Sequence, residues 1–297
     1  MIDKTVMVTI VGRPNVGKST LVNALVGEKI SIVTPKPQTT RNRIFGVALR
    51  GGTQLVLVDT PGFHRARTKL GDYMVKVVRD SVDDVDAVCL VVEAKANVGH
   101  QEEALIERIK QSGAPAVLAV NKIDTVKKEE LLPVIALYSE KHDFEAVVPV
   151  SARTGSGIGE LFDELEKFAK EGQQLFPEDM ITDQPERQMC AEIIREKLLL
   201  NLQSEVPHGV AVEISSFKVR DDGITEISAT IYCEKESHKG IIIGKNGDML
   251  KKVGEQASID MEKLLDGKVF LSLWAKVKPG WRDSGANLRT FGYSDEN

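Results

Sequence analysis

Short apolar runs alternate with amphipathic segments through the first half of the chain. A β-branched run at residues 6–11 predicts a buried strand, and residues 19–26 predict a helix that ends at Gly27. The Gly51-Gly52 pair between runs at 43–50 and 53–59 predicts a β-hairpin. Further strands are expected at 87–92, 116–120 and 146–150, with helices near 70–82, 100–112, 128–141 and 158–170. This alternation predicts a three-layer α/β domain with a six-stranded, mostly parallel sheet, in which the hairpin supplies the one antiparallel pair.

A polar stretch with Gly172, Pro177 and Pro185 follows, and the pattern then changes. Asp183 and Glu186 have the spacing of a capping box for the next helix, with Pro185 in its first turn. The expected elements are a helix at 186–204, strands at 210–219 and 224–234 around an Asp-Asp-Gly turn, a short helix, a Gly-Lys-Asn-Gly loop, a helix at 248–265 and a strand at 268–277. We therefore predict domains at 1–172 and 188–297, joined by a linker at 173–187.

The composition is that of a protein with two globular domains, and it indicates the cellular compartment. The chain has 297 residues, of which 42% are apolar and 28% charged, and no apolar run approaches the roughly 20 residues of a membrane span. The N-terminus leads straight into a strand and lacks the pattern of a signal peptide. Three cysteines lie far apart without a CxxC pair, and Cys89 falls in an apolar run where a buried thiol is expected. We expect a cytoplasmic protein.

Residues 12–19 follow the spacing G-x-x-x-x-G-K-[ST] between the first predicted strand and helix. Glycines in such a loop let the backbone wrap around phosphates, so that amide groups and the helix N-terminus point at the anion. Lys18 is expected to neutralise the β- and γ-phosphates, and Ser19 to bind Mg²⁺. The predicted phosphate-binding residues are Gly12, Arg13, Pro14, Asn15, Val16, Gly17, Lys18, Ser19 and Thr20.

Two further motifs follow predicted strands and complete a nucleotide site. Asp59 ends one strand, where it would hold Mg²⁺ through water, and the Gly62 amide would sense the γ-phosphate. Asn121-Lys122-Ile123-Asp124 follows another strand. The Asp124 carboxylate can accept hydrogen bonds from guanine N1–H and the exocyclic amine, whereas adenine offers no amine there. Ser151, Ala152 and Arg153 complete the predicted base pocket, with the Ala152 amide facing the base oxygen and Arg153 in place of the usual Lys.

In order and spacing these motifs resemble the translation-factor-like class of small GTPases over residues 4–170. The resemblance implies a first switch loop at about 28–43 and a second at about 59–71. It favours Thr40 as the Mg²⁺ ligand of the GTP state, with Thr39 as the alternative, so that Ser19, Thr40 and Asp59 form the metal site. Lys18, Thr40 and Gly62 are the residues assigned to the hydrolytic step.

The position after Gly62, where many such GTPases have Gln, is Phe63. Phe cannot orient the attacking water, so we expect Phe63 to pack and hydrolysis to be slow. His64 could orient a water, although a solvated side chain is the simpler explanation. In related GTPases an Asn at the position of Asn15 holds K⁺. Here Asn15 either does the same or stabilises the loop.

The loop Gly244-Lys245-Asn246-Gly247 is a weak motif alone, but the elements around it indicate a function. It lies in the helix–strand–strand–helix–helix–strand order of a type II KH domain, whose GxxG loop clamps four nucleotides of single-stranded RNA. The alternative is a helical corner of an unrelated α+β domain. The chain has a formal charge of −5, and residues 186–297 contain 16 basic and 18 acidic residues. Bulk charge would therefore not attract RNA, and RNA binding requires a site of specific shape. We expect Trp274 in the core, whereas Trp281 could stack on bases. The predicted RNA-binding residues are Ile241, Ile242, Gly244, Lys245, Asn246, Gly247 and Lys251.

A GTPase domain joined to a C-terminal type II KH domain resembles the Era family of bacterial ribosome-assembly GTPases. Similar segments run nearly end to end, at 12–19, 38–41, 61–75, 177–187, 205–208 and 288–293. The resemblance implies binding near the 3′ end of 16S rRNA in the maturing 30S subunit, with the GTP state favouring RNA, in a monomer. It also includes peripheral membrane association, for which no amphipathic anchor is evident in the sequence.

Three other function classes fit parts of the pattern. A P-loop phosphotransferase would need an acceptor site, and the guanine-selective motif argues against it. A GTPase fused to a tRNA-modifying or transport domain would need a catalytic constellation or a membrane span in 186–297. A binding module that never hydrolyses GTP remains open because of Phe63. We expect a nucleotide-gated RNA chaperone.

Overall fold

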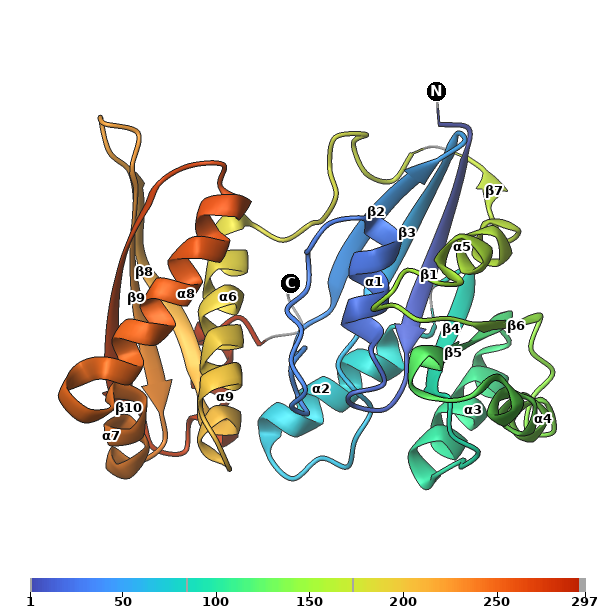
Figure 1. Cartoon of the computed structure of the whole chain (residues 1–297), viewed down its shortest axis with the longest axis horizontal. Coiled ribbons are helices and arrows are strands. Elements are labelled where there is room, and N and C mark those ends of the chain that lie inside the picture. Colours follow the sequence, from blue (N-terminus) through green and yellow to red (C-terminus); the bar gives the residue numbers. More distant parts are fainter. Residues whose placement is uncertain (1, 84, 173, 294–297) are drawn as a thin grey trace. The chain divides into compact units, whose positions relative to one another are not determined.

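The structure is a computed structural model that describes residues 2–83, 85–172 and 174–293 (Figure 1). The chain divides into two compact units, the first ending at Asp183 and the second beginning at Gln184. The short segments Thr34–Thr39 and Thr68–Leu70 group with the second unit. The predicted domain and linker ranges include residues 1, 84, 173 and 294–297, which lie outside the described residues.

The first unit is built on the predicted sheet, whose six main strands have the order β2-β3-β1-β4-β5-β6. All neighbours are parallel except β2 and β3, which form the hairpin around Gly51-Gly52. A two-residue strand, β7, adds a second antiparallel pair at β1, which the sequence pattern does not reveal. The strand bounds are β1 Lys4–Val11, β2 Ile44–Arg50, β3 Thr53–Asp59, β4 Ala87–Glu93, β5 Ala116–Asn121, β6 Ala146–Pro149 and β7 Lys170–Glu171.

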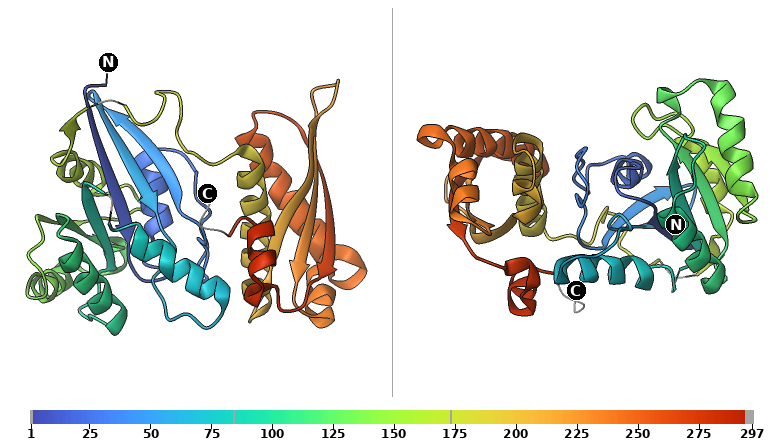
Figure 2. Two further views of the ribbon diagram at one scale, coloured as in Figure 1. Left: turned by 180° about the vertical axis from the view of Figure 1, so that it is seen from behind. Right: turned by 90° about the horizontal axis from the view of Figure 1, so that it is seen from below.

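Helices cover both faces of this sheet, as the predicted three-layer architecture requires (Figure 2). Alternate residues of a strand point to opposite faces, so the central strands β1, β4 and β5 contribute to two apolar clusters. One cluster joins the sheet to α1 and α5, and the other joins it to α2, α3 and α4. Cys89 lies fully buried in the first cluster, which confirms the expected core thiol. The helix bounds are α1 Lys18–Val26, α2 Lys69–Asp80, α3 His100–Ser112, α4 Leu131–Ser139 and α5 Ile158–Glu166, with 3₁₀ turns at Ile123–Thr125 and Lys128–Glu130.

The linker forms hydrogen bonds with β2 and β3 at the edge of the first sheet. The predicted capping box at Asp183 is wrong. The Val47 amide donates to the Ile181 carbonyl at 2.9 Å, and the Gln54 side chain bonds the backbone of Phe176. The Asp183 carboxylate accepts the Phe45 amide at 3.1 Å, and Asp183 lies two residues before the N-cap position of the following helix. Helix α6 begins at Glu186 with Pro185 in the N-cap position. The partner of Asp183 is 138 residues away in sequence, so local spacing could not reveal it.

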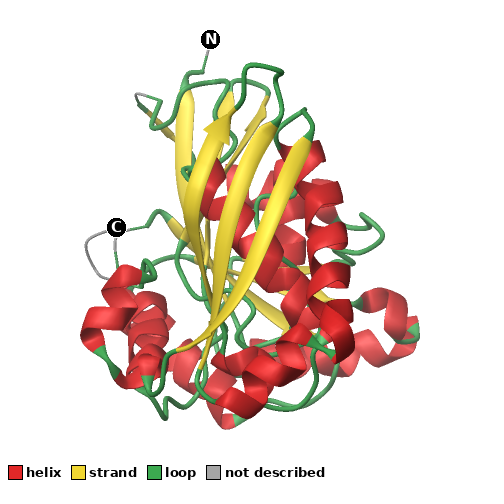
Figure 3. Cartoon of the chain, turned by 90° about the vertical axis from the view of Figure 1, so that its left-hand side faces the viewer, coloured by secondary structure: helices red, strands yellow, loops and turns green. Residues whose placement is uncertain are grey.

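The second unit has the predicted order of elements around a three-stranded sheet, β10-β9-β8. Strands β8 and β9 are antiparallel and β10 is parallel to β9. Helices α6 and α8 pack their apolar side chains on one face of this sheet, and Figure 3 looks onto the strands. The bounds are α6 Glu186–Asn201, β8 Ala211–Val219, β9 Thr225–Cys233, α7 Glu236–Ile243, α8 Asp248–Leu264, β10 Val269–Val277 and α9 Gly285–Thr290, with 3₁₀ turns at Val206–Gly209, Lys245–Gly247 and Trp281–Asp283. This arrangement confirms a type II KH fold.

The two tryptophans have the reverse of their expected environments. Trp281 is 0% exposed, donates from Nε1 to the Gly209 carbonyl at 2.9 Å and packs edge-to-face on Phe291. Trp274 is 50% exposed. In β10 the odd-numbered positions pack against the core, so the even-numbered Trp274 falls on the opposite face of the sheet. Trp281 therefore belongs to the core, and Trp274 does not.

Across the described part of the chain, no helix combines the length and the apolar character needed to cross a membrane.

Candidate functional site

The phosphate loop leads from the end of β1 into α1, as its sequence predicts. The Lys18 ammonium lies buried inside the loop and donates to the Gly12 and Arg13 carbonyls at 3.1 and 3.0 Å. Burial lowers the pKa of Lys18 to about 8, while the Asp59 carboxylate opposes this shift. Lys18 is thus held at the loop by two carbonyls that an anionic phosphate oxygen would replace or supplement.

Three predicted metal ligands lie at the adjacent sheet edge. The Ser19 and Thr40 hydroxyls are 2.8 Å apart, which brings the first switch loop to α1. Asp59 ends β3 and is 0% exposed, and neither carboxylate oxygen has a hydrogen-bond partner among the described residues. Burial raises the pKa of Asp59, and Lys18 opposes the rise. Two hydroxyls beside a buried carboxylate form a set of hard oxygen ligands that fits Mg²⁺.

The structure separates the two candidate threonines of the first switch loop. The Thr39 hydroxyl bonds to the Lys36 carbonyl and to the Thr34 hydroxyl, each at 2.7 Å. The Thr40 hydroxyl instead contacts Ser19. The geometry therefore favours Thr40 over Thr39 as the ligand.

Gly62 brings the second switch loop against the phosphate loop. A Cβ atom at Gly62 would lie 2.6 Å from Pro14 Cα, so no larger residue permits this approach. The Phe63 amide donates to the Gly12 carbonyl at 3.1 Å, which fixes the same contact. The backbone amide of Gly62 is thereby held beside the loop that is predicted to carry the phosphates.

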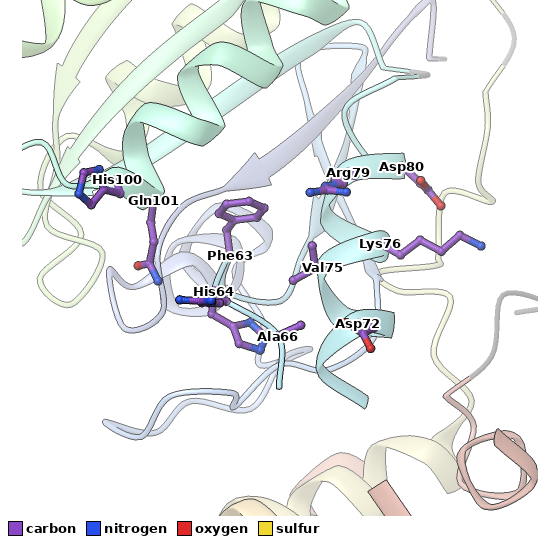
Figure 4. A pocket seen from close by; sticks show the side chains of 11 residues that line it. Phe63, His64, Ala66, Asp72, Val75, Lys76, Arg79, Asp80, His100 and Gln101 are labelled. Carbon is purple, nitrogen blue, oxygen red and sulfur yellow. The ribbon is translucent and has the colours of Figure 1, made fainter. Parts of the chain in front are cut away.

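Phe63 packs, as expected, against the apolar cluster formed with α2, α3 and α4. Its ring also lines a cavity of about 650 Å³ between the second switch loop, α2 and the start of α3 (Figure 4). His64 lies in the same wall, and its Nδ1 is 3.0 Å from the Gly62 carbonyl. Phe63 offers no group that could orient a water.

Asn121 connects the phosphate loop to both base-binding loops. Its amide group donates to the Val16 carbonyl at 2.8 Å, and its Oδ1 accepts the Lys122 and Ala152 amides at 2.8 and 3.0 Å. We expected the Ala152 amide to face the base oxygen, and in this structure it donates to Asn121 instead. The Asn121 side chain therefore connects the phosphate loop to the loops that contain Lys122 and Ala152.

Asp124 lies where the base is predicted to bind. It accepts the Ser151 hydroxyl at 2.6 Å and forms an ion pair with Arg153. The bond from Ser151, followed by Arg153, lowers the pKa of Asp124. The carboxylate is consequently ionised at neutral pH and can accept two donors from a guanine. The Arg153 side chain is 75% exposed, so it can yield its position to a base.

Two glutamates that sequence reasoning missed tie these loops together. Glu93, the last residue of β4, forms an ion pair with Lys122, whose ammonium also donates to the Asn15 carbonyl at 2.5 Å. Burial of Glu93 acts to raise its pKa, but hydrogen bonds from Lys122 and Lys95 outweigh burial and lower it. Buried Glu102 forms an ion pair with Arg13 of the phosphate loop. The available signal was the position of Glu93 at the carboxyl end of a strand, like Asp59 and Asn121.

The GxxG loop of the second unit connects α7 to α8. Asn246 and Gly247 have φ values of 55° and 85°, and a Cβ at Gly247 would meet open space. Ile241 is 49% exposed beside the loop, and the Lys251 side chain is 77% exposed on α8. Ile242, which we expected to contact RNA, is fully buried in the core and supports the loop from beneath. The loop backbone, Lys245 and the exposed Ile241 remain available to a ligand.

Two family models match the chain. Residues 7–122 match a model described as 50S ribosome-binding GTPase, and residues 205–282 match the KH domain. GTPase Era of Ruminiclostridium cellulolyticum is 53% identical over 98% of this chain and 97% of its own length. GTPase Era of Alkaliphilus metalliredigens is 50% identical over 98% of this chain and 99% of its own.

Two solved structures share the whole fold. One is Era in complex with MgGDPNP and nucleotides 1506–1542 of 16S ribosomal RNA, with a TM-score of 0.95 and 39% identity over 98% of this chain and 99% of that one. The other is a point variant of Aquifex aeolicus Era bound to GDP and AlF4⁻, with a TM-score of 0.94 and the same identity and coverage. Both were solved with a guanine nucleotide, which agrees with the site built above.

Proposed function

The chain belongs to the Era family of GTPases, and on this premise we propose that it binds single-stranded RNA near the 3′ end of 16S rRNA and assists assembly of the small ribosomal subunit. One observation carries the proposal: a complete guanine-nucleotide site and an open GxxG loop occur in one chain. The related Era structure with the same fold holds both MgGDPNP and that stretch of RNA. GTP, GDP and Mg²⁺ are the nucleotides and metal that this site accepts.

In the proposed mechanism, the phosphate loop binds the nucleotide before any chemistry occurs. Lys18 places its ammonium against the β- and γ-phosphates, and the amides of residues 13–19 surround them. Mg²⁺, held by Ser19, Thr40 and Asp59, neutralises negative charge on the same phosphates. The Gly62 amide donates to the γ-phosphate, so loss of that group releases both Thr40 and Gly62. Because Phe63 orients no water, turnover is slow and the GTP state persists long enough to act as a switch.

Guanine is selected by the Asp124 carboxylate. The base displaces the Arg153 guanidinium and donates its N1–H and amine to the two carboxylate oxygens. Ser151 bonds to this acceptor directly. Asn121 fixes the loops on either side by accepting the amides of Lys122 and Ala152. Adenine would leave the carboxylate facing an acceptor, which is the basis of the discrimination.

A K⁺ ion held at Asn15 would give the proposed mechanism a second source of positive charge. We propose that its side chain contributes to a K⁺ site beside the transferring phosphate. The alternative is that Asn15 serves only the loop, since its carbonyl accepts the Lys122 ammonium. Single-turnover hydrolysis in KCl and in NaCl separates these roles: faster hydrolysis in K⁺ that Asn15→Ala removes supports the site, and equal rates in the two salts exclude it.

The GxxG loop is proposed to clamp the RNA backbone. Gly244, Lys245, Asn246 and Gly247 present a short stretch of backbone with one ammonium, and the space beside Gly247 admits a phosphate. Ile241 and Lys251 lie next to the loop and would contact a base and the sugar–phosphate chain respectively. We propose that the protein acts as a monomer in the cytoplasm, where its RNA is assembled, and that any membrane association is peripheral.

Paired substitutions in the full chain test the proposal. Gly247→Asp places a carboxylate against the phosphates, while Gly247→Asn has the same shape and also tolerates a positive φ. We expect the Asp variant to lose affinity for the 16S 3′ RNA and the Asn variant to keep most of it, with GDP affinity unchanged in both. Equal RNA affinity in the two variants would contradict the proposed clamp. Lys18→Ala should abolish GTP binding while GxxG-dependent RNA binding persists.

A further inference from the structure

The sheet of the second unit has one face that α6 and α8 do not cover, and the segment after β10 covers only its end at Tyr232, where Phe291 packs on the Tyr232 ring. Helices α6 and α8 and the odd-numbered residues of β10 form the core on the other face. In Figure 1 the three strands lie along one side of the unit and these helices along the other, and Figure 3 looks onto the uncovered side. Phe270 and Trp274, both on β10, are each 50% exposed on this face.

The strand register places these rings in an ordered array. Phe270 lies beside Glu226 and Lys218, and Trp274 lies beside Thr230 and Glu213. Four residues along a strand separate the rings by about 13 Å. The row between them consists entirely of serines, Ser272, Ser228 and Ser216. The face thus alternates an aromatic row, a hydroxyl row and a second aromatic row.

The charges of this face suit an anionic ligand. The Arg220 guanidinium lies over the Phe270 ring at 5.0 Å and engages Glu226, and the Tyr232 hydroxyl engages Glu213. Both carboxylates of the face therefore have donors. Beyond Arg220, the face and its rim carry the cationic residues Lys218, Lys276 and Lys278. The acidic residues Asp222 and Glu234 at the edges of this face lie beside Arg220 and Arg282, so Lys218, Lys276 and Lys278 can contact the phosphates of a strand that lies across the rows.

We propose that this face is a second binding site for single-stranded nucleic acid, with Phe270 and Trp274 as stacking platforms for two bases. Exposed aromatics on a sheet bind splayed bases regardless of sequence, and an Arg plane adds to such a stack. The serine hydroxyls between the rings would bond to base edges or sugar hydroxyls. A protein–protein interface is depleted in serine, whereas the centre of this face is a row of three serines.

The inference relies on the proposed function only for the class of ligand. The GxxG loop lies between α7 and α8, on elements separate from the aromatic rows, so the two sites can fail independently. Together they would hold a longer single strand than the four nucleotides of a GxxG clamp. The second site would then prevent that strand from refolding while the first site holds it.

The two tryptophans make the test direct. Trp274 is half exposed and Trp281 is fully buried, so quenching of tryptophan emission by RNA reports on Trp274. The full chain carrying Gly247→Asp, which disables the GxxG loop, is titrated with a 12-nucleotide single-stranded oligouridine and with a 12-base-pair RNA duplex. We expect saturable quenching with the single strand and none with the duplex. Absence of quenching by the single strand would overturn the inference and leave the GxxG proposal intact.

Substitutions distinguish stacking from general effects. Trp274→Ala and Phe270→Ala should each weaken binding of the oligouridine about tenfold, measured by anisotropy of a labelled strand. Trp274→Phe should retain most of the affinity although it removes the reporter. Ile259→Ala is the matched control, since Ile259 is 56% exposed on α8. Equal affinities for Trp274→Ala and Ile259→Ala would refute stacking. Self-association that Trp274→Ala abolishes, without oligouridine binding, would overturn the inference and assign the face to a second copy of the chain.

Discussion

The buried ammonium of Lys18 makes nucleotide binding sensitive to pH. Its pKa falls from an ordinary 10.5 to about 8 in the empty site, chiefly through burial. At about 1.4 kcal/mol per pKa unit, this difference corresponds to about 3 kcal/mol of disfavoured charge. A bound phosphate would relieve most of that cost, because it places a counter-charge beside the ammonium.

The sign of the effect follows from the two pKa values. Below pH 8 Lys18 is already charged in the empty site, so nucleotide binds without taking up a proton. Above pH 8 the empty-site Lys18 is neutral and binding must take up a proton. Apparent affinity should therefore fall by about tenfold between pH 7 and pH 9. The unfolded chain holds this proton up to its ordinary pKa, so the contribution of Lys18 to folding stability rises with pH between about 8 and 10.5.

Titration calorimetry of GDP binding at pH 7, 8 and 9 measures both quantities. The titrations contain EDTA and are repeated in two buffers that differ in ionisation enthalpy. We expect uptake of about half a proton per nucleotide at pH 8 and about 0.9 at pH 9. Lys18→Arg is the control, because Arg keeps its charge throughout and shares any titration of the nucleotide itself. Equal pH dependence in the wild-type chain and Lys18→Arg would refute the reasoning.

Three further predictions concern other parts of the two units. Asp124→Asn removes a charged acceptor of two hydrogen bonds and should weaken GDP binding on the order of 10²–10³-fold in a displacement assay, so a loss below tenfold would contradict its role. Glu93→Gln removes the partner of Lys122 and should weaken GDP binding about tenfold, whereas the exposed control Glu129→Gln should not. Trp281→Ala should destabilise the second unit by about 3–5 kcal/mol in urea, and a loss below 1 kcal/mol would contradict its buried position.

Features fixed by short-range pattern were predictable from the sequence. The phosphate-loop spacing, the strand ending at Asp59 and the strand preceding Asn121 place all three at the carboxyl edge of a parallel sheet, and the structure has them there. The order of elements around Gly244–Gly247 likewise identified the KH fold. Periodicity and turn residues are local properties, so they can be recognised in the sequence without knowledge of the packing.

Features that depend on distant partners were not predictable. Asp183 has the spacing of a cap, yet it bonds to Phe45 on β2. Trp274 is as apolar as its neighbours, and only the facing of β10 places it outside the core. Glu93 gains its role from Lys122, 29 residues further along the chain. In each case the role of the residue can be assigned only from the tertiary arrangement, because its residue type is compatible with more than one environment.

We propose that one chain couples a guanine-nucleotide site to a GxxG clamp for the 3′ end of 16S rRNA. The most direct measurement is the affinity of the full chain for an RNA spanning nucleotides 1506–1542, the segment present in the related Era complex, against a scrambled RNA of equal length. It is made with a non-hydrolysable GTP analogue and with GDP, for the wild type, Gly247→Asp and Gly247→Asn. We predict that the authentic RNA binds more tightly with the analogue than with GDP. This binding should be lost in Gly247→Asp and kept in Gly247→Asn. Equal affinity for both RNAs, in both nucleotide states, would contradict it.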